Sequence, residues 1–212
     1  MSTLSNTVEA PRVPVLADLI SNVWVKNFVL VLGGALFTAL CAQIVIPMTP
    51  VPMTGQTLAV MLVGAALGWK RGMAALTLYM VLGFFLPVYS DGGSGIDNIT
   101  GIGTIAGATG GYIIGFIFAA GAVGWLAERG SDRKVLTAFA SFIVGQLIVF
   151  GFGLAGLKLA APELVEIGAM SSASWSTVLH DGFTIFIIGG LVKAAIGALL
   201  MPAAWKLAEK TR

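Results

Sequence analysis

The sequence predicts an all-α integral membrane protein with six transmembrane helices and both termini on the inner side. Composition, the length of the apolar runs and the placement of the basic residues lead to this prediction. Of the 212 residues, 57% are hydrophobic and only 10% are charged, and the mean hydropathy is +0.94. A soluble domain carries about 25% charged residues, because its surface must be solvated. The composition therefore excludes an ordinary soluble enzyme and a disordered or collagen-like chain.

Six apolar stretches reach or approach the roughly 20 residues that cross a bilayer as a helix. The predicted spans are 27–46, 55–69, 72–86, 109–127, 135–157 and 182–205. The second and third are short, and a tilted hairpin or a thinned bilayer would accommodate them. These runs are apolar on all sides, whereas the strands of membrane barrels alternate. The expected organisation is a leader (1–26), a six-helix membrane domain (27–205) and a tail (206–212).

The basic residues segregate strongly when six spans are drawn with the N-terminus inside. Lys158 is then the single basic residue outside, and Lys193 lies within the last span. Because cytoplasmic loops are enriched in Lys and Arg, this distribution predicts six spans with both termini on the cytoplasmic side. The ten residues on the inner side are Arg12, Lys26, Lys70, Arg71, Arg129, Arg133, Lys134, Lys206, Lys210 and Arg212.

Several kinds of site are excluded by residue counts. Cys41 is the only cysteine, so there is no internal disulfide, and no metal-ligand spacing occurs. A net charge of +2 does not indicate nucleic-acid binding. No Gly-Lys dipeptide exists, so the chain has no phosphate-binding loop for ATP. We therefore expect no cofactor and no metal, and any energy from ATP must come from another chain.

Lys193 is the residue that points most directly to function. An intramembrane lysine costs about 2.5–3.5 kcal/mol on insertion scales, so it usually faces a cavity or a partner. It is predicted near mid-depth of the sixth span, where it would bind an anion or a carbonyl oxygen; the alternative is a lysine that bonds a helix carbonyl. Gly189 and Gly190 share its helical face and either leave room for a ligand or allow close helix packing.

A second polar group lies in the predicted outer loops. Its residue types suit hydrogen bonds to a polar ring, although turns and helix caps use the same types. Asn98 and Tyr112 are the preferred contacts. The other candidates are Tyr89, Asp91 and Asp97, together with Thr54 and Gln56 before the second span.

One catalytic alternative is considered. Gly92-Gly93-Ser94-Gly95 has the spacing of an intramembrane serine protease motif, and His180 is the only histidine. Both residues are predicted outside the helices, where a buried Ser–His pair would not form. The chain is therefore not expected to be an enzyme.

The sequence resembles the BioY family, the biotin-specific substrate-capture subunits of energy-coupling factor transporters. The likeness is carried by Val51-Pro-Met-Thr-Gly-Gln-Thr-Leu, by Leu86-Pro-Val-Tyr and by Gly107-Ala-Thr-Gly-Gly-Tyr-Ile-Ile-Gly-Phe. It extends from the first span to the last. Gly190 stands where the family's last helix has an aspartate, three residues before its lysine.

The resemblance implies a six-helix S component that binds biotin in an outward-facing cavity and releases it inward. Its partners would be a transmembrane coupling subunit and two ATPase subunits, within the lipid bilayer. Ala35 and Ala39 match the family's face for the coupling subunit, and Lys193 matches its lysine. A solitary carrier, or a carrier of another small carboxylated vitamin, is the alternative transport function.

Overall fold

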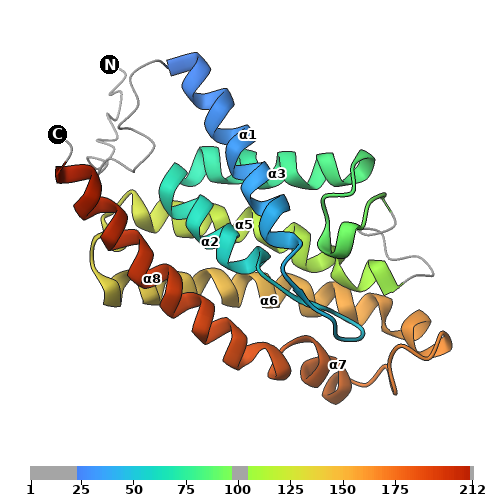
Figure 1. The fold of residues 1–212 in the computed structure, drawn as a ribbon. Coiled ribbons are helices and arrows are strands. Elements are labelled where there is room, and N and C mark those ends of the chain that lie inside the picture. Colours follow the sequence, from blue (N-terminus) through green and yellow to red (C-terminus); the bar gives the residue numbers. More distant parts are fainter. Residues whose placement is uncertain (1–22, 97–104, 211–212) are drawn as a thin grey trace, which may run out of the picture.

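The computed structural model describes residues 23–96 and 105–210, and most of the described chain is helical (Figure 1). Short 3-10 turns and one antiparallel hairpin connect the helices. The helices are α1 (Val23–Ala42), α2 (Gln56–Leu67), α3 (Trp69–Phe85), α5 (Gly110–Ala127), α6 (Val135–Glu166), α7 (Trp175–Gly182) and α8 (Ile187–Lys210). The remaining elements are β1 (Val45–Ile46), β2 (Met53–Thr54), η2 (Ser90–Gly92), η3 (Ile105–Thr109), η4 (Ser131–Arg133) and η5 (Thr184–Phe186).

In the part of the chain that the structure describes, five segments are long and apolar enough to cross a membrane, so the prediction of a multi-pass helical membrane protein is confirmed. They are 24–42, 69–92, 107–127, 135–166 and 175–210. The 12 residues of α2 extend about 18 Å, which is less than the hydrocarbon thickness of about 30 Å. Helix length alone therefore supports five crossings and leaves α2 as a shorter apolar helix.

Several predicted helix ends shift. The first helix ends at Ala42 rather than at residue 46, because Val45 and Ile46 pair with Thr54 and Met53 across the proline-rich turn. The break between α2 and α3 falls at Gly68, before the predicted break at residues 70 and 71, because its φ of 80° suits a glycine. The fifth predicted span runs on to residue 166, and the last helix begins at 187 rather than 182, since α7 and η5 occupy 175–186.

Helix α5 is the central helix of the bundle. In the most apolar stretch of the membrane-spanning segment that contains α5, 61% of the residues are buried, against 22% in the corresponding stretch of α1. Glycines allow its backbone to approach its neighbours closely: a Cβ on Gly111 would meet Phe152 O and lie 3.0 Å from Gly156 Cα in α6. A Cβ on Gly64 of α2 would lie 2.6 Å from Ala120 O of α5. Small residues thus set the distance between α5 and the helices around it.

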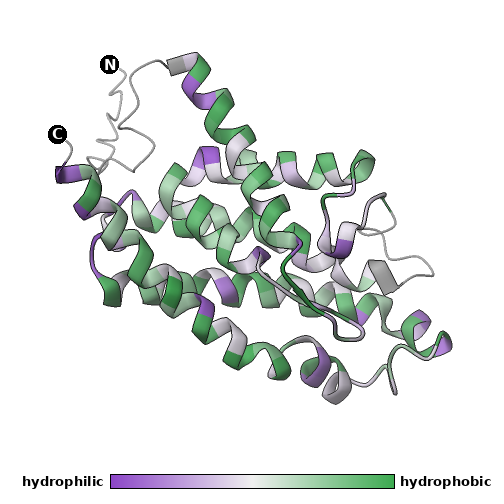
Figure 2. Cartoon of the chain, viewed as in Figure 1, coloured by the Kyte–Doolittle hydropathy of each residue, from purple (hydrophilic) through white to green (hydrophobic). Residues whose placement is uncertain are grey.

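Most basic residues of the described chain, with the exception of Lys158 and Lys193, gather at one end of the bundle, which we call the basic end. The start of α1, the α2–α3 turn, the α5–α6 turn and the end of α8 meet there. Arg71 Nε donates to Asn27 Oδ1 at 2.8 Å, and Trp69 N donates to Glu128 Oε1 at 3.2 Å. Figure 2 shows apolar colour along most of the helices and polar colour mainly near their ends and in the connections. The predicted segregation of charge is therefore present in three dimensions.

A buried carboxylate joins two elements at the basic end. Asp132 in η4 is 2% exposed and its Oδ2 accepts a hydrogen bond from Trp205 Nε1 of α8 at 2.5 Å. The Arg133 guanidinium lies over the Trp205 ring, with its Cζ 3.5 Å from the ring centroid. Burial raises the pKa of Asp132, while the Trp205 hydrogen bond and the Arg133 charge oppose that rise. This cluster fixes the α5–α6 turn against the end of α8.

Replacing Asp132 by alanine is expected to lower the free energy of unfolding by about 1–3 kcal/mol, because the Trp205 N–H loses its acceptor. Asparagine keeps an acceptor oxygen and should lower the free energy of unfolding by less.

The stability contributed by Asp132 should also depend on pH. Since folding raises the pKa of Asp132, its contribution to stability is full below the unfolded pKa and is lost as the pH rises through the folded pKa. Thermal unfolding of detergent-purified protein across pH checks this; an Asp132→Asn variant with the same pH dependence as the wild type would contradict it.

Candidate functional site

A cavity opens at the opposite end of the bundle, which we call the cavity end. The space in it, counted together with the part that is open to the outside, is about 610 Å³. The β1–β2 hairpin and the starts of α2, α5 and α8 surround it, with α6 on one side. Its lining residues are Val51, Pro52, Thr54, Gln56, Thr57, Ser90, Thr109, Tyr112, Ile113, Phe116, Gln146, Val149, Phe150, Phe186, Gly190 and Lys193.

Lys193 alone is charged among the residues that line the described cavity. Its Nζ donates to Thr57 Oγ1 at 3.2 Å, and the structure describes no carboxylate within ion-pair distance of it. Lys193 is the seventh residue of α8, so it lies about 9 Å from the helix start and nearer the cavity end than the predicted mid-depth position. The lysine therefore brings one positive charge to an apolar pocket.

The start of α2 adds a polar wall opposite α8. Thr54 Oγ1 donates to Gln56 Oε1 at 2.7 Å, and Gln56 Nε2 donates to Tyr79 Oη at 2.6 Å. The first turn of α2 has the partial positive charge of a helix N-terminus, which favours an anion. Lys193 and this turn are linked through Thr57. Together they make this side of the cavity suitable for a negatively charged or strongly polar oxygen.

The predicted residues Thr54, Gln56, Tyr112, Gly190 and Lys193 all line the cavity. The structure thus gathers residues from the hairpin and from α2, α5 and α8 into one site. The hydroxyl of Tyr112 donates to Gly182 O at 2.8 Å, which ties α5 to the end of α7 and leaves the ring at the cavity.

Other predicted site residues lie elsewhere. Tyr89 is 1% exposed and its hydroxyl donates to Met80 O at 2.6 Å, because its ring packs edge-on against Tyr79 in the core. Asp91 is exposed in a left-handed turn (φ 56°), and its neighbour Ser90 lines the cavity instead. Gly189 faces Met53 and does not line the cavity. These three residues do not line the cavity in this structure, and Asp97 and Asn98 lie outside the described residues.

The two alanines predicted to form a docking face on α1 are not exposed at its surface. Ala35 is 0% exposed and belongs to the hydrophobic core, so it has no surface for another subunit in this structure. Ala39 is partly buried. The outward surface of α1 is formed by other residues, among them Val29, Leu36 and Leu40. The predicted leader lies mostly outside the described residues.

Sequence reasoning missed Gln146 and the aromatic wall of the cavity. Gln146 comes from α6, is 6% exposed, and its Nε2 donates to Gly190 O at 2.7 Å. A lone amide in an apolar span was the available signal. Phe150 packs edge-on against Phe183, with ring centroids 5.0 Å apart, and Phe186 lies beside it. In the sequence of an apolar span, a phenylalanine that lines a cavity cannot be distinguished from one that faces lipid.

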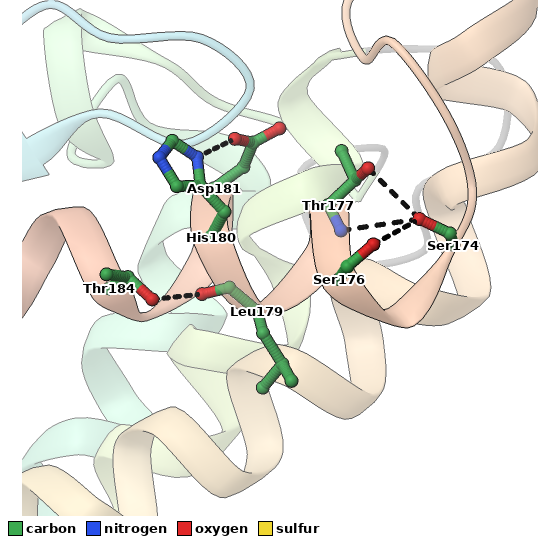
Figure 3. A network of polar contacts seen from close by, with 7 residues as sticks. All are labelled: Ser174, Ser176, Thr177, Leu179, His180, Asp181 and Thr184. Carbon is green, nitrogen blue, oxygen red and sulfur yellow. Dashed lines mark hydrogen bonds and ion pairs between the residues drawn. The ribbon is translucent and has the colours of Figure 1, made fainter.

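The polar side chains of helix α7 bond mainly to one another and to the backbone of the same segment (Figure 3). Ser174 caps the helix by accepting from Thr177 N at 3.4 Å, and it also contacts the Ser176 hydroxyl. His180 Nδ1 lies 2.8 Å from Asp181 Oδ1 of the next residue. The histidine therefore pairs with an adjacent carboxylate, and the structure gives no Ser94–His180 contact among the described residues.

Comparison with known proteins decides the family. A model of the BioY family matches residues 10–210. The chain belongs to the BioY family. This confirms the resemblance seen in the sequence motifs.

Curated BioY proteins are similar over most of their length. The chain is 31% identical over 176 residues to biotin transporter BioY2 of Lactococcus lactis subsp. cremoris, covering 82% of this chain and 87% of that protein. It is 34% identical over 159 residues to biotin transporter BioY of Rhizobium etli, covering 71% and 76%. A probable biotin transporter BioY of Pyrococcus horikoshii is 38% identical over 170 residues, covering 78% and 90%. These BioY relatives are named as transporters and not as enzymes.

The fold is also shared with a solved structure. The crystal structure of the S-component for biotin from an ECF-type ABC transporter matches with a TM-score of 0.70 and 21% identity, covering 88% of this chain and 95% of that one. The helical arrangement described above is therefore the fold of that solved structure.

Proposed function

We propose that this chain is the biotin-binding membrane subunit of an energy-coupling factor transporter in a prokaryotic cell membrane. Its curated relatives are biotin transporters, and the protein that shares its fold is an S-component for biotin. The observation that carries the proposal is the cavity with a single cation among amides, hydroxyls and aromatic rings. Biotin combines an apolar bicyclic body with a polar urea edge and an anionic tail, which is the chemistry that such a cavity accommodates.

In this proposal the basic end lies on the cytoplasmic side and the cavity end faces outward. The segregation of basic residues supports this orientation under the positive-inside rule. The hairpin β1–β2 and the short helix α2 together form the sixth crossing. Both termini are then inside, and the cavity takes up biotin from outside before releasing it inward.

Energy for release comes from partner chains in this proposal. The sequence has no phosphate-binding loop. A transmembrane coupling subunit and two ATPase subunits would supply the ATP-driven step. The outward face of α1 around Ala39 is where we place the contact with the coupling subunit.

Detergent-purified chain is expected to bind biotin at a ratio of one ligand per chain and to bind thiamine at least a hundredfold more weakly. The reason is that thiamine is a cation without a urea edge, and Lys193 repels positive charge. Isothermal titration with the two vitamins tests the substrate. Equal affinities, or heat from neither vitamin, would contradict the proposed function.

Uptake of labelled biotin in cells tests the partners. Cells that hold this chain together with a coupling subunit and ATPases should accumulate biotin, and cells that lack those partners should not. Full accumulation without partners would instead make the chain a solitary carrier.

A further inference from the structure

The side chain of Gln146 lies across the backbone of Gly190, within the wall of the cavity. Besides the hydrogen bond from Nε2 to Gly190 O, a Cβ built on Gly190 would fall well inside van der Waals contact of Gln146 Oε1 and 3.4 Å from its Cδ. The amide thus occupies the space that a side chain at position 190 would need. Gln146 can therefore hold this position only while residue 190 has no side chain.

The nitrogen and the oxygen of the Gln146 amide differ in their hydrogen bonding. Gln146 Nε2 is held by the α8 carbonyl, whereas Gln146 Oε1 accepts no hydrogen bond from the described residues. The other amide in the wall differs, because Gln56 Oε1 already accepts from Thr54 and its Nε2 already donates to Tyr79. Gln146, whose side chain lines the cavity, therefore keeps one acceptor that has no partner among the described residues.

This acceptor complements Lys193. Gly190 and Lys193 are three residues apart in α8 and lie on the same helical face. The Lys193 ammonium has only donors, and the Gln146 side-chain oxygen is only an acceptor. The Gln146 amide, held at Gly190, and Lys193 therefore offer opposite hydrogen-bonding functions one turn of α8 apart. An acceptor in an apolar pocket costs free energy unless a ligand donor meets it.

We infer that Gln146 is a ligand-binding residue whose Oε1 accepts a hydrogen bond from a ring N–H of the ligand. Building on the proposed function, the ligand is biotin and the donor is one of its two urea N–H groups. Gly190 serves this contact as a positioning residue, because it leaves room for the amide and its carbonyl holds Nε2. The pair thereby makes the site specific for cyclic ligands that carry an N–H donor.

Calorimetry on detergent-purified chain tests the inference with biotin and with its two derivatives methylated on one or the other urea nitrogen. The wild type should bind at least one derivative about tenfold or more weakly than biotin, since the acceptor is left unpaired. Gln146→Leu, which keeps the size of the side chain, should bind biotin about tenfold more weakly and should no longer distinguish that derivative from biotin. A Gln146→Leu variant that keeps wild-type affinity and discrimination would overturn the inference.

Two further variants separate binding from folding. Ser141→Ala removes a different buried polar group of α6, a hydroxyl that donates to Thr137 O of its own helix, and should bind all ligands like the wild type. Gly190→Ala should mimic Gln146→Leu, because the new methyl group displaces the amide. In a Gln146→Ala background, Gly190→Ala should weaken biotin binding little further than Gln146→Ala does alone. Additive losses of affinity in the double variant would contradict the dependence of the two positions.

Failure of the inference is distinguishable from failure of the proposed function. If wild-type chain and Ser141→Ala do not bind biotin at all, the proposed function fails and the inference fails with it. If both bind biotin and the Gln146 and Gly190 variants bind it equally well and discriminate equally, only the inference fails.

Discussion

Replacing Lys193 by alanine is expected to weaken biotin binding by at least tenfold. The lysine is the single charged group among the described residues of the cavity wall, and its Nζ is held only by Thr57 Oγ1. A hydrogen bond to a charged group contributes about 1.5–3 kcal/mol, which corresponds to about 10- to 100-fold in affinity. Isothermal titration of the purified variant with biotin measures the loss.

A matched control uses the other lysine of the cavity end. Lys158 donates to Ala173 O and lies over the Trp175 ring, outside the cavity, so Lys158→Ala should bind biotin like the wild type. Lys193→Arg keeps the charge and should lose less affinity than alanine. Unchanged affinity of Lys193→Ala for biotin would remove Lys193 from the site.

The uncharged carboxamide of biotin shows which oxygen Lys193 meets. If Lys193→Ala weakens biotin but not the carboxamide, the lysine binds the carboxylate. If it weakens both equally, the lysine binds the urea oxygen. The start of α2 lies beside the lysine and favours negative charge at either position.

Replacing Gly111 by valine is expected to destabilise the whole bundle. The first added carbon would meet Phe152 O and lie 3.0 Å from Gly156 Cα, and both of these are backbone atoms that no rotamer change can move. Overpacking of a core costs about 1–3 kcal/mol, occasionally more, and this contact joins the central helix α5 to α6. The apparent melting temperature in detergent, followed by size-exclusion chromatography after heating, should fall by several degrees.

Gly151→Val provides the control for this change. Gly151 also lies in the α5–α6 region, on α6, but it is exposed and a Cβ there would meet nothing within 4 Å. Its melting temperature should stay near that of the wild type. Equal losses for the two variants would mean that helix propensity, and not the α5–α6 contact, sets the effect.

Much of the site could be predicted because intramembrane polarity is costly and therefore informative. Lys193 is a charge in an apolar run, and Thr54, Gln56 and Tyr112 stand out against similar surroundings. Gln146 carried the same kind of signal. Its role became visible only when α6 and α8 were placed side by side, since residues 146 and 190 are 44 positions apart.

The predicted site residues that lie outside the cavity share one physical cause. Tyr89, Asp91 and Gly189 lie close in sequence to residues that line the cavity, but a turn or a helix sends adjacent side chains in different directions. Tyr89 turns into the core while Ser90 reaches the cavity. Ala35 likewise faces the core because small residues suit close helix contacts as well as they suit docking faces.

The sequence by itself determined that this is a membrane protein, where its helices approximately lie, and that most of its basic residues are separated to one end. Those properties follow from local hydropathy and charge, which each residue carries wherever it packs. Only the tertiary structure decided which faces of the helices enclose the cavity and that Gln146 occupies the room left by Gly190. That choice depends on the rotation and spacing of helices distant in sequence, which backbone contacts between small residues set.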